Sequence, residues 1–139
     1  EFGTGLRKTI IALNNLILPE NLISIKRQTN EWEAGYQPQG APTPEFPLRR
    51  INLDPGYLSL SKVVLATTKD HAHRIYMGQG IFEEITLIYR KKEGFRPNPW
   101  TYPDYRAQDR LDFFNGLRQQ YLAMLRFDDT AQKEKSAAS

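Results

Sequence analysis

The chain contains no cysteine among its 139 residues. This absence excludes disulfide bonds, thiol nucleophiles and zinc or iron–sulfur centres held by cysteine, and it fits a reducing compartment. No apolar run approaches the roughly 20 residues that a membrane-spanning helix needs, and the N-terminus lacks the charged and then apolar pattern of a signal peptide. We therefore expect a cytoplasmic protein with no membrane partner.

The chain also has little net charge. Nineteen Lys and Arg residues stand against sixteen Asp and Glu, which leaves a net charge of +3. The charges are dispersed, without the long like-charged blocks typical of polyanion-binding segments. Proteins that bind nucleic acid electrostatically show a larger and more clustered excess of cations. The pattern therefore argues against nucleic acid as a general partner.

Motifs with a known reaction are absent as well. The chain has no dinucleotide-binding glycine pattern, no GxSxG elbow and no HExxH zinc motif. Residues 3–9 are superficially similar to a phosphate-binding loop, but Arg7 stands where that motif needs glycine and a strand-like run follows. Whether the protein is an enzyme, and which cofactor it uses, therefore stays open.

The elements that are present follow from hydrophobic periodicity. Strands are predicted where isoleucine-rich or alternating segments occur, and a β-hairpin is predicted where two such segments flank Gly78-Gln79-Gly80. Helices are predicted where apolar residues recur at helical spacing, with Asp104 as the N-cap of the last one. The expected strands are residues 6–18, 49–54, 74–77 and 81–90, the expected helices are 19–34 and 104–127, and residues 60–68 fit either state, with helix favoured.

Proline and glycine mark the connections. Residues 36–47 hold four prolines and a glycine and predict a surface loop, residues 54–56 predict a tight turn, and residues 95–106 are too rich in proline to be regular. The polar residues 128–139 are expected to fray. The fold class is thus a single α+β domain over residues 1–127, with a mixed or antiparallel sheet of about four strands packed against two main helices.

The strongest functional signal is the run Lys69-Asp70-His71-Ala72-His73-Arg74. A core needs apolar side chains, so burial alone does not explain this run. His71 or His73 could transfer a proton, because imidazole titrates near neutral pH. Lys69 and Arg74 could hold an anion by charge and bidentate hydrogen bonds. This composition predicts a site for a phosphorylated or otherwise anionic small molecule, such as a nucleotide.

Other residues are assigned to the same hypothetical site. Asp54 would orient a catalytic group, and the aromatic side chains after residue 96 would cover the ligand. The candidate catalytic residues are therefore His71, His73 and Asp54, and the candidate ligand-binding residues are Lys62, Lys69, Arg74, Tyr57, Trp100 and Tyr102.

Two less specific interpretations remain open. His71 and His73 could hold a metal with help from Asp54, Glu83, Glu84 or Asp104, but a metal centre normally needs three or four protein ligands and the chain has no third histidine, so no metal site is predicted. Alternatively, the run is a hydrogen-bonded loop. In that case the protein is a non-catalytic module that binds a protein or RNA. The binding surface would be the aromatic segment 97–106 and the edge of the predicted hairpin (residues 74–77 and 81–90).

Three runs between residues 52 and 105 are long enough to be specific: NLDPGYL (52–58), TKDHAHRIY (68–76) and PWTYPDY (99–105). They resemble a bacterial and archaeal family of uncharacterised proteins, the domain of unknown function family 4416. The resemblance extends from residue 3 through the final helix. It implies that this chain lacks an N-terminal strand and helix of typical members and that its loop 36–47 is longer than the family norm.

The resemblance implies no catalytic residues, because none are established for the family. Some members are labelled GTP-binding. The residues of this chain supply neither a phosphate-binding loop nor the guanine-reading NKxD motif, so the label adds nothing to the site predicted above.

Overall fold

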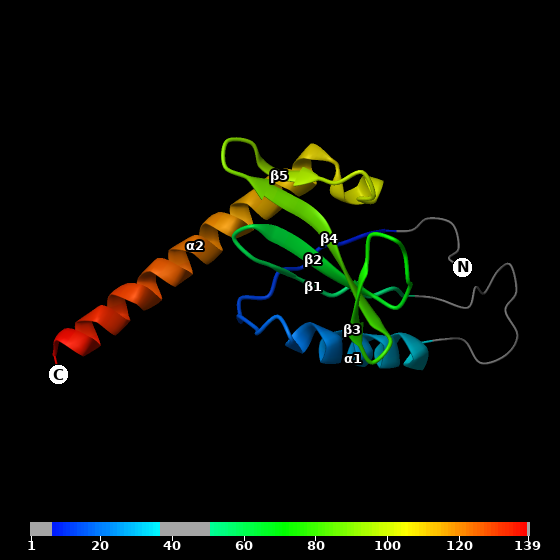
Figure 1. Cartoon of the computed structure of the whole chain (residues 1–139), viewed down its shortest axis with the longest axis horizontal. Coiled ribbons are helices and arrows are strands. Elements are labelled where there is room, and N and C mark those ends of the chain that lie inside the picture. The colour runs from blue at the N-terminus through cyan, green and yellow to red at the C-terminus, as the bar shows by residue number, and fades with distance from the viewer. Residues whose placement is uncertain (1–6, 37–50, 139) are drawn as a thin grey trace, which may run out of the picture. The chain divides into compact units, whose positions relative to one another are not determined.

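A computed structural model of the chain describes residues 7–36 and 51–138. Over these residues the fold is α+β, as expected, with two α-helices and one antiparallel sheet of five strands (Figure 1). The elements in chain order are α1 Asn21–Gly35, β1 Gly56–Leu58, β2 Lys62–Thr67, β3 Ile75–Gly78, β4 Ile81–Arg90, β5 Gly94–Pro97, a 3₁₀ helix Pro103–Tyr105, and α2 Gln108–Ala137.

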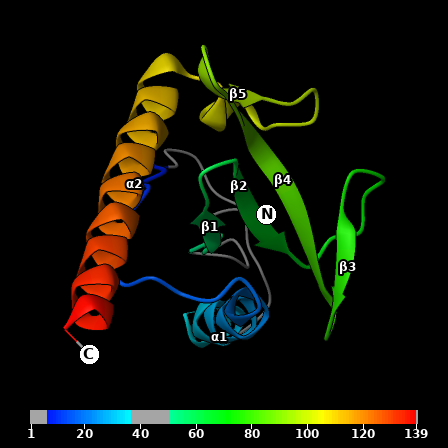
Figure 2. The same cartoon turned by 60° about the vertical axis from the view of Figure 1, so that its left-hand side comes forward.

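The sheet has the strand order β1-β2-β4-β3, and β5 also pairs with β4. β4 is the longest strand, and it pairs antiparallel with β3 through its first residues and with β5 through its last (Figure 2). The β3–β4 turn has positive φ angles at Gly78 (102°), Gln79 (54°) and Gly80 (77°). Glycine adopts such angles without strain, so Gly78-Gln79-Gly80 suits the turn and the predicted hairpin is confirmed.

Contacts divide the chain into two compact units, Glu1–Gly56 with Leu65–Glu84, and Tyr57–Val64 with Ile85–Ser139. The division passes through β2 and β4. The first unit therefore contains α1 and the β3–β4 turn, and the second contains β5 and α2.

In the first unit, α1 starts just after Pro19, close to the predicted position, and buries Leu22 completely. Two charged residues on this helix, Lys26 and Glu33, are also buried. Lys26 Nζ donates a hydrogen bond to the carbonyl of Leu53 (2.8 Å), and a Glu33 carboxylate oxygen accepts one from the N–H of Leu53 (2.6 Å). Charged side chains of α1 thus satisfy the backbone of an extended segment.

The hydrogen bonds from Lys26 and Glu33 to the backbone of Leu53 explain one wrong prediction. Residues 51–54 were expected to form a strand and a turn was expected at 54–56, but residues 51–55 form neither, and the chain enters β1 at Gly56. Ile51 and Leu53 are still more buried than Asn52 and Asp54, as a strand would have them. The burial of residues 51–54 therefore alternates as in a strand, but these residues form no ladder of hydrogen bonds to a neighbouring strand in the described part of the chain. Side chains of α1 replace that strand as hydrogen-bonding partners. Residues 49 and 50 lie outside the described residues.

In the second unit, the core forms between the end of β4, β5 and the first half of α2. Leu87 and Phe95 are fully buried, and Leu111 and Phe114 on α2 are 4% and 6% exposed. The Tyr105 ring stacks on Phe114 with their centroids 6.1 Å apart. The beginning of the amphipathic pattern that predicted the final helix therefore packs on this core, whereas Met124, farther along the same pattern, is exposed.

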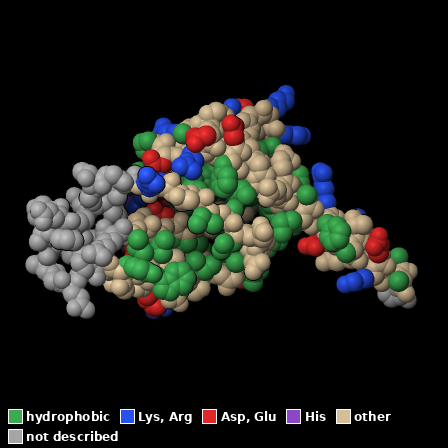
Figure 3. All heavy atoms as spheres, turned by 180° about the vertical axis from the view of Figure 1, so that it is seen from behind, with side chains coloured by type: hydrophobic (Ala, Val, Ile, Leu, Met, Phe, Trp, Pro, Cys, Tyr) green, Lys and Arg blue, Asp and Glu red, His purple; other side chains and the backbone are tan. Residues whose placement is uncertain are grey.

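The N-terminal segment contradicts the sequence expectation. Residues 7–18 form no strand, and Ile11 and Leu13 are 77% and 83% exposed. Hydrophobic side chains also occupy part of the surface drawn in Figure 3. A strand needs a neighbouring backbone to supply hydrogen bonds, and none of the described strands pairs with this segment. Its β-forming composition is not sufficient without that partner.

Residues 60–68 fitted either a helix or a strand with helix favoured, and the favoured state is wrong. Residues 62–67 form β2, which buries Val63, Val64 and Ala66. The β-branched valines and threonine fit a pleated surface, and burial on the sheet outweighs the capping potential of Ser59 and Ser61.

Three details of the C-terminal third also differ from expectation. Residues 95–97, expected to be irregular, belong to β5 because this strand pairs with the end of β4. Asp104 lies inside the 3₁₀ helix, and the N-cap position of α2 is Ala107. Residues 128–137, expected to fray, continue α2. Residues 37–47 of the predicted proline-rich loop lie outside the described residues.

Candidate functional site

The run Lys69 to Arg74 connects β2 with β3 in the first unit. Two short-range hydrogen bonds shape it: the Arg74 N–H donates to the His71 carbonyl (2.9 Å), and the Lys69 N–H donates to Thr67 Oγ1 (3.2 Å). Lys69, Asp70 and His71 are exposed, whereas His73 and Arg74 are partly covered. The connection is therefore a folded turn with a polar outer face.

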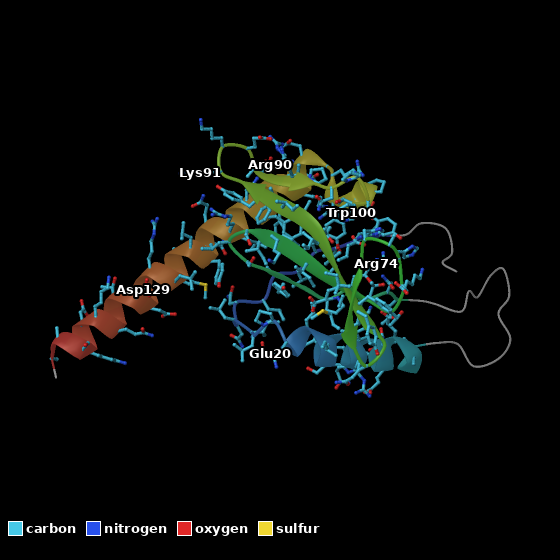
Figure 4. The ribbon with its side chains drawn as sticks, in the orientation of Figure 1. Glu20, Arg74, Arg90, Lys91, Trp100 and Asp129 are labelled. Carbon is cyan, nitrogen blue, oxygen red and sulfur yellow. The ribbon has the colours of Figure 1, made fainter. Side chains whose placement is uncertain are left out.

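The covered side of this turn is organised by Glu84. Glu83 and Glu84 are adjacent in β4, and successive residues of a strand point to opposite faces, so one of the two must point inward. The side chain of Glu84 is 4% exposed. Its Oε2 atom lies 3.0 Å from Nε2 of His73 and 2.9 Å from Nε of Arg74. One buried carboxylate oxygen thus joins both residues (Arg74 is labelled in Figure 4).

Arg74 is largely committed to the protein itself. Its side chain is 6% exposed, and besides the bond to Glu84 its Nη1 atom donates to the carbonyl of Lys69 (3.1 Å). A buried carboxylate costs roughly several kcal/mol to desolvate, even after the protein relaxes around it, unless a cation and hydrogen bonds compensate it. Arg74 supplies both to Glu84.

The outer side of the turn brings the two histidines together. The rings of His71 and His73 are stacked with centroids 5.8 Å apart and an interplanar angle of 19°. The side chain of His73 is 26% exposed, and Lys69 is exposed on the same connection. Chemically, the connection offers an oriented imidazole, a second imidazole beside it and an exposed ammonium group.

Asp54, the third candidate catalytic residue, is held elsewhere in the first unit. Its carboxylate accepts a hydrogen bond from Asn52 Nδ2 (2.7 Å) and lies 3.8 Å from Nζ of Lys26. Its described partners therefore belong to α1 and to the segment before β1, not to the Lys69–Arg74 connection. The assignment of Asp54 to the site stays a prediction.

The remaining candidates belong to the second unit. Tyr57 is on β1, Lys62 begins β2, and Tyr102 is exposed before the 3₁₀ helix. The indole N–H of Trp100 donates to the carbonyl of Ile85 (3.0 Å), which ties the proline-rich loop to β4. This contact gives Trp100 a structural role, and the ligand-binding roles of all four residues stay predictions.

Arg106 and Thr101 complete the attachment of that loop. Thr101 is buried, and its hydroxyl donates to the carbonyl of Thr86 (2.6 Å). Arg106 donates to the carbonyls of Thr101, Asn98 and Pro99 at 2.7, 3.2 and 2.7 Å. The loop is therefore fixed by hydrogen bonds in place of regular secondary structure.

Sequence analysis named Glu84 only as one of several metal-ligand alternatives and missed its central position. The available signal was the Glu83-Glu84 pair within an apolar strand, which forces one carboxylate inward. Glu83, the neighbour, is partly buried, and this burial raises the pKa of its carboxyl above the ordinary value. Which glutamate met His73 depended on the strand register, which the sequence did not specify.

Two searches of the described part of the chain gave no positive result. Residues 7–36 and 51–138 contain no group of three or more His, Asp or Glu side chains placed to hold a metal ion. Within the same residues, neither helix is long and apolar enough to cross a membrane.

Comparison with known families gives one match. A family model described as "Domain of unknown function (DUF4416)" matches residues 1–121. The chain belongs to this family. The resemblance seen in NLDPGYL, TKDHAHRIY and PWTYPDY is thereby confirmed, and the DUF4416 match includes the whole Lys69–Arg74 connection and Glu84. The searches of curated proteins and of solved structures found no match.

Proposed function

We propose that the Lys69–Arg74 connection is a binding site for a phosphorylated or otherwise anionic small molecule, for example a nucleotide. The observation that carries this proposal is the stacked His71–His73 pair on the same connection as exposed Lys69, with His73 bonded to buried Glu84. Burying a carboxylate to orient a partly exposed histidine favours a chemical role over a purely structural one.

Each residue has a role in this proposal. Lys69 attracts the anion by charge, with Lys62 as a further candidate, and His71 or His73 donates hydrogen bonds to it or moves a proton. Asp54 remains the candidate for orienting a catalytic group, and Tyr57, Trp100 and Tyr102 remain candidates from the sequence for covering the ligand. The site is catalytic if His71 or His73 transfers a proton to or from the ligand. Without that transfer it only binds the anion.

The test is a thermal-shift screen of nucleotides and phosphorylated metabolites, followed by titration of each compound that binds. We expect Lys69→Ala, His71→Ala and His73→Ala each to weaken binding about tenfold, the effect of losing about 1.4 kcal/mol. Lys91→Ala and Lys92→Ala are matched controls, because these lysines are exposed in the turn after β4 (Lys91 is labelled in Figure 4). If the three variants bind as the controls do, the site lies elsewhere.

The second candidate function is a non-catalytic interaction module, and one observation favours it. β3 is the last strand in the sheet order, and it exposes Ile75, Tyr76 and Met77 at 67%, 59% and 42%. The strand carries no Lys or Arg, which RNA binding would require. These features support a protein partner that adds a strand to this edge.

Affinity capture with the whole chain tests this alternative. A partner that adds a strand is expected to be retained by the wild type and by His71→Ala, to be lost with Tyr76→Lys, and to resist ribonuclease treatment. Loss of the partner with ribonuclease would assign the binding to RNA. Retention by Tyr76→Lys would exclude the β3 edge.

A further inference from the structure

The arrangement around Glu84 determines which nitrogen of His73 carries the proton. We infer that Glu84 and Arg74 are positioning residues that hold His73 with its proton on Nε2, so that Nδ1 is the ring's proton-accepting nitrogen. This inference deepens the proposed function and rests on it for its significance, but its test does not require a ligand.

The guanidinium of Arg74 is always a cation and a hydrogen-bond donor. Its Nε atom lies 2.9 Å from Oε2 of Glu84, so Oε2 is an acceptor in that bond. His73 Nε2 is 3.0 Å from the same oxygen. An ionised carboxylate only accepts hydrogen bonds, and the bond from Arg74 identifies Oε2 as an accepting oxygen. His73 must therefore donate through Nε2–H.

Burial makes this choice strong. Glu84 and Arg74 are 4% and 6% exposed, so water competes little for the carboxylate, and hydrogen bonds at such sites are stronger than in water. The opposite tautomer would place the lone pair of Nε2 against the carboxylate oxygen. The buried pair would then lose a donor, which costs more than the small intrinsic preference between the tautomers of imidazole.

The geometry also separates the two cations of this connection by role. Arg74 uses Nε for Glu84 and Nη1 for the carbonyl of Lys69, and both bonds lie within the turn. Arg74 therefore acts through Glu84 and His73. Lys69 and His71, which are exposed, are the residues that would meet an anion. This division replaces the initial interpretation in which Arg74 binds the ligand directly.

For catalysis, the consequence is a defined direction of proton transfer. Any proton that His73 accepts goes to Nδ1, and the imidazolium so formed is stabilised by the carboxylate on its other side, as in the carboxylate–histidine pairs of hydrolases. Glu84 does not take the proton itself. It orients the ring and compensates the charge.

Nitrogen NMR of the histidine ring tests the inference directly. The chain has two histidines, so His71→Asn in an untagged, uniformly ¹⁵N-labelled protein leaves the signals of His73 alone. At about pH 8, where imidazole is ordinarily neutral, we expect a protonated Nε2 and an unprotonated Nδ1. A protonated Nδ1 in that spectrum would overturn the inference.

Two variants made on the same His71→Asn background separate positioning from folding. In Arg74→Met with Glu84→Leu, both buried charges are replaced by apolar groups, a change that buried ion pairs tolerate. We expect a mixture of tautomers for His73 in this folded variant. Arg96→Met with Glu93→Leu removes an exposed ion pair elsewhere and is expected to leave the tautomer unchanged.

The outcomes distinguish this inference from the proposed function. If His73 carries its proton on Nε2 in the parent and becomes mixed in the Arg74→Met, Glu84→Leu variant, the positioning roles stand even when no anion binds in the screen. If the tautomer is the same in both proteins, Glu84 does not set it, and the inference fails even when an anion does bind at Lys69.

Discussion

A single carboxylate decides how the most polar segment of this protein is arranged. Glu84 is one of two adjacent glutamates in β4, and it receives both His73 and Arg74 on one oxygen atom. A shift of the β4 register by one residue would have placed Glu83 next to His73 and Arg74 and exposed Glu84. The chemistry available to the Lys69–Arg74 connection is thus set by the strand that lies behind it.

Removing this carboxylate alone should be costly. Glu84→Ala leaves the Arg74 cation buried without its counter-charge, and we expect the free energy of unfolding in urea to fall by about 3–5 kcal/mol. Arg74→Met with Glu84→Leu should recover most of that loss. Arg96→Ala is the control, because the Arg96–Glu93 pair is 41% and 51% exposed and contributes under about 1 kcal/mol. Equal losses in Glu84→Ala and Arg96→Ala would show that the buried pair contributes no more than a surface pair.

Glu83 should give the protein a separate pH dependence. Burial raises the pKa of its carboxyl, so the folded protein binds a proton at this residue more tightly than the unfolded chain does. Stability contributed at Glu83 is therefore complete below the ordinary glutamate pKa and declines as the pH rises through the raised value. Glu83→Gln, which stays neutral, should match the wild type in acid and be more stable at neutral pH.

Urea unfolding from about pH 4 to pH 8 measures this difference. Glu134→Gln, at an exposed position on α2, is the control and should show no such divergence. A Glu83→Gln curve parallel to the wild-type curve at every pH would refute the proposed penalty.

At the scale of elements, the contact of Gly94 with Asn115 joins β5 to α2. Gly94 has a φ of +78°, and a Cβ atom there would lie 2.8 Å from the side-chain amide of Asn115. The same amide accepts a hydrogen bond from the N–H of Phe95 (2.9 Å). The glycine therefore permits both the backbone conformation and the close approach of the helix.

Gly94→Ala should consequently destabilise the protein. The left-handed conformation costs about 1–2 kcal/mol with a side chain, and the displaced Asn115 adds to this. Gly116→Ala is the matched control: this glycine lies inside α2, a Cβ atom there would meet nothing within 4 Å, and alanine should stabilise the helix by about 0.5–1 kcal/mol. Thermal denaturation of the two variants should give shifts of opposite sign, and a stabilised Gly94→Ala would contradict the contact.

Elements with a local sequence signal were predicted correctly, and elements that depend on a distant partner were not. The hairpin and both helices were predictable, because their signals are local: Gly78-Gln79-Gly80 sets the turn, and apolar spacing sets the helical faces. Residues 7–18 and 51–54 have strand-like composition, yet a strand needs a partner that local sequence does not specify. Residues 60–68 fitted either a helix or a strand, and helix was wrongly favoured because the local sequence does not show the strand partners of Val63 and Val64 in β2.

The candidate site shows the same limit. The Lys69–Arg74 run was predicted as the candidate site, and the rings of its two histidines are stacked in the structure. Glu84 was not predicted as its centre, because ten residues and a hairpin turn separate it from Arg74. Asp54 was placed there on chemical grounds, whereas Lys26 and Asn52 hold it.

On the scale of the whole molecule, stability should be concentrated in the first half of α2. Leu111 and Phe114 are the buried residues of this helix, whereas residues 132–138 are exposed. Phe114→Ala should therefore cost about 3–5 kcal/mol of unfolding free energy. Removal of residues 132–139 should change it by less than about 0.5 kcal/mol. Urea titrations of both proteins test this, and a large loss on truncation would reveal contacts of the helix end.

The hairpin also has a consequence for the order of folding. His73 and Arg74 are eleven and ten residues from Glu84 along the chain, so their union requires only the closure of a short loop. Such closure costs little entropy, and β-hairpins form in about 1–10 μs. The cluster can therefore assemble during the first steps of folding, and its geometry is encoded within a segment short enough to emerge from the ribosome as one piece.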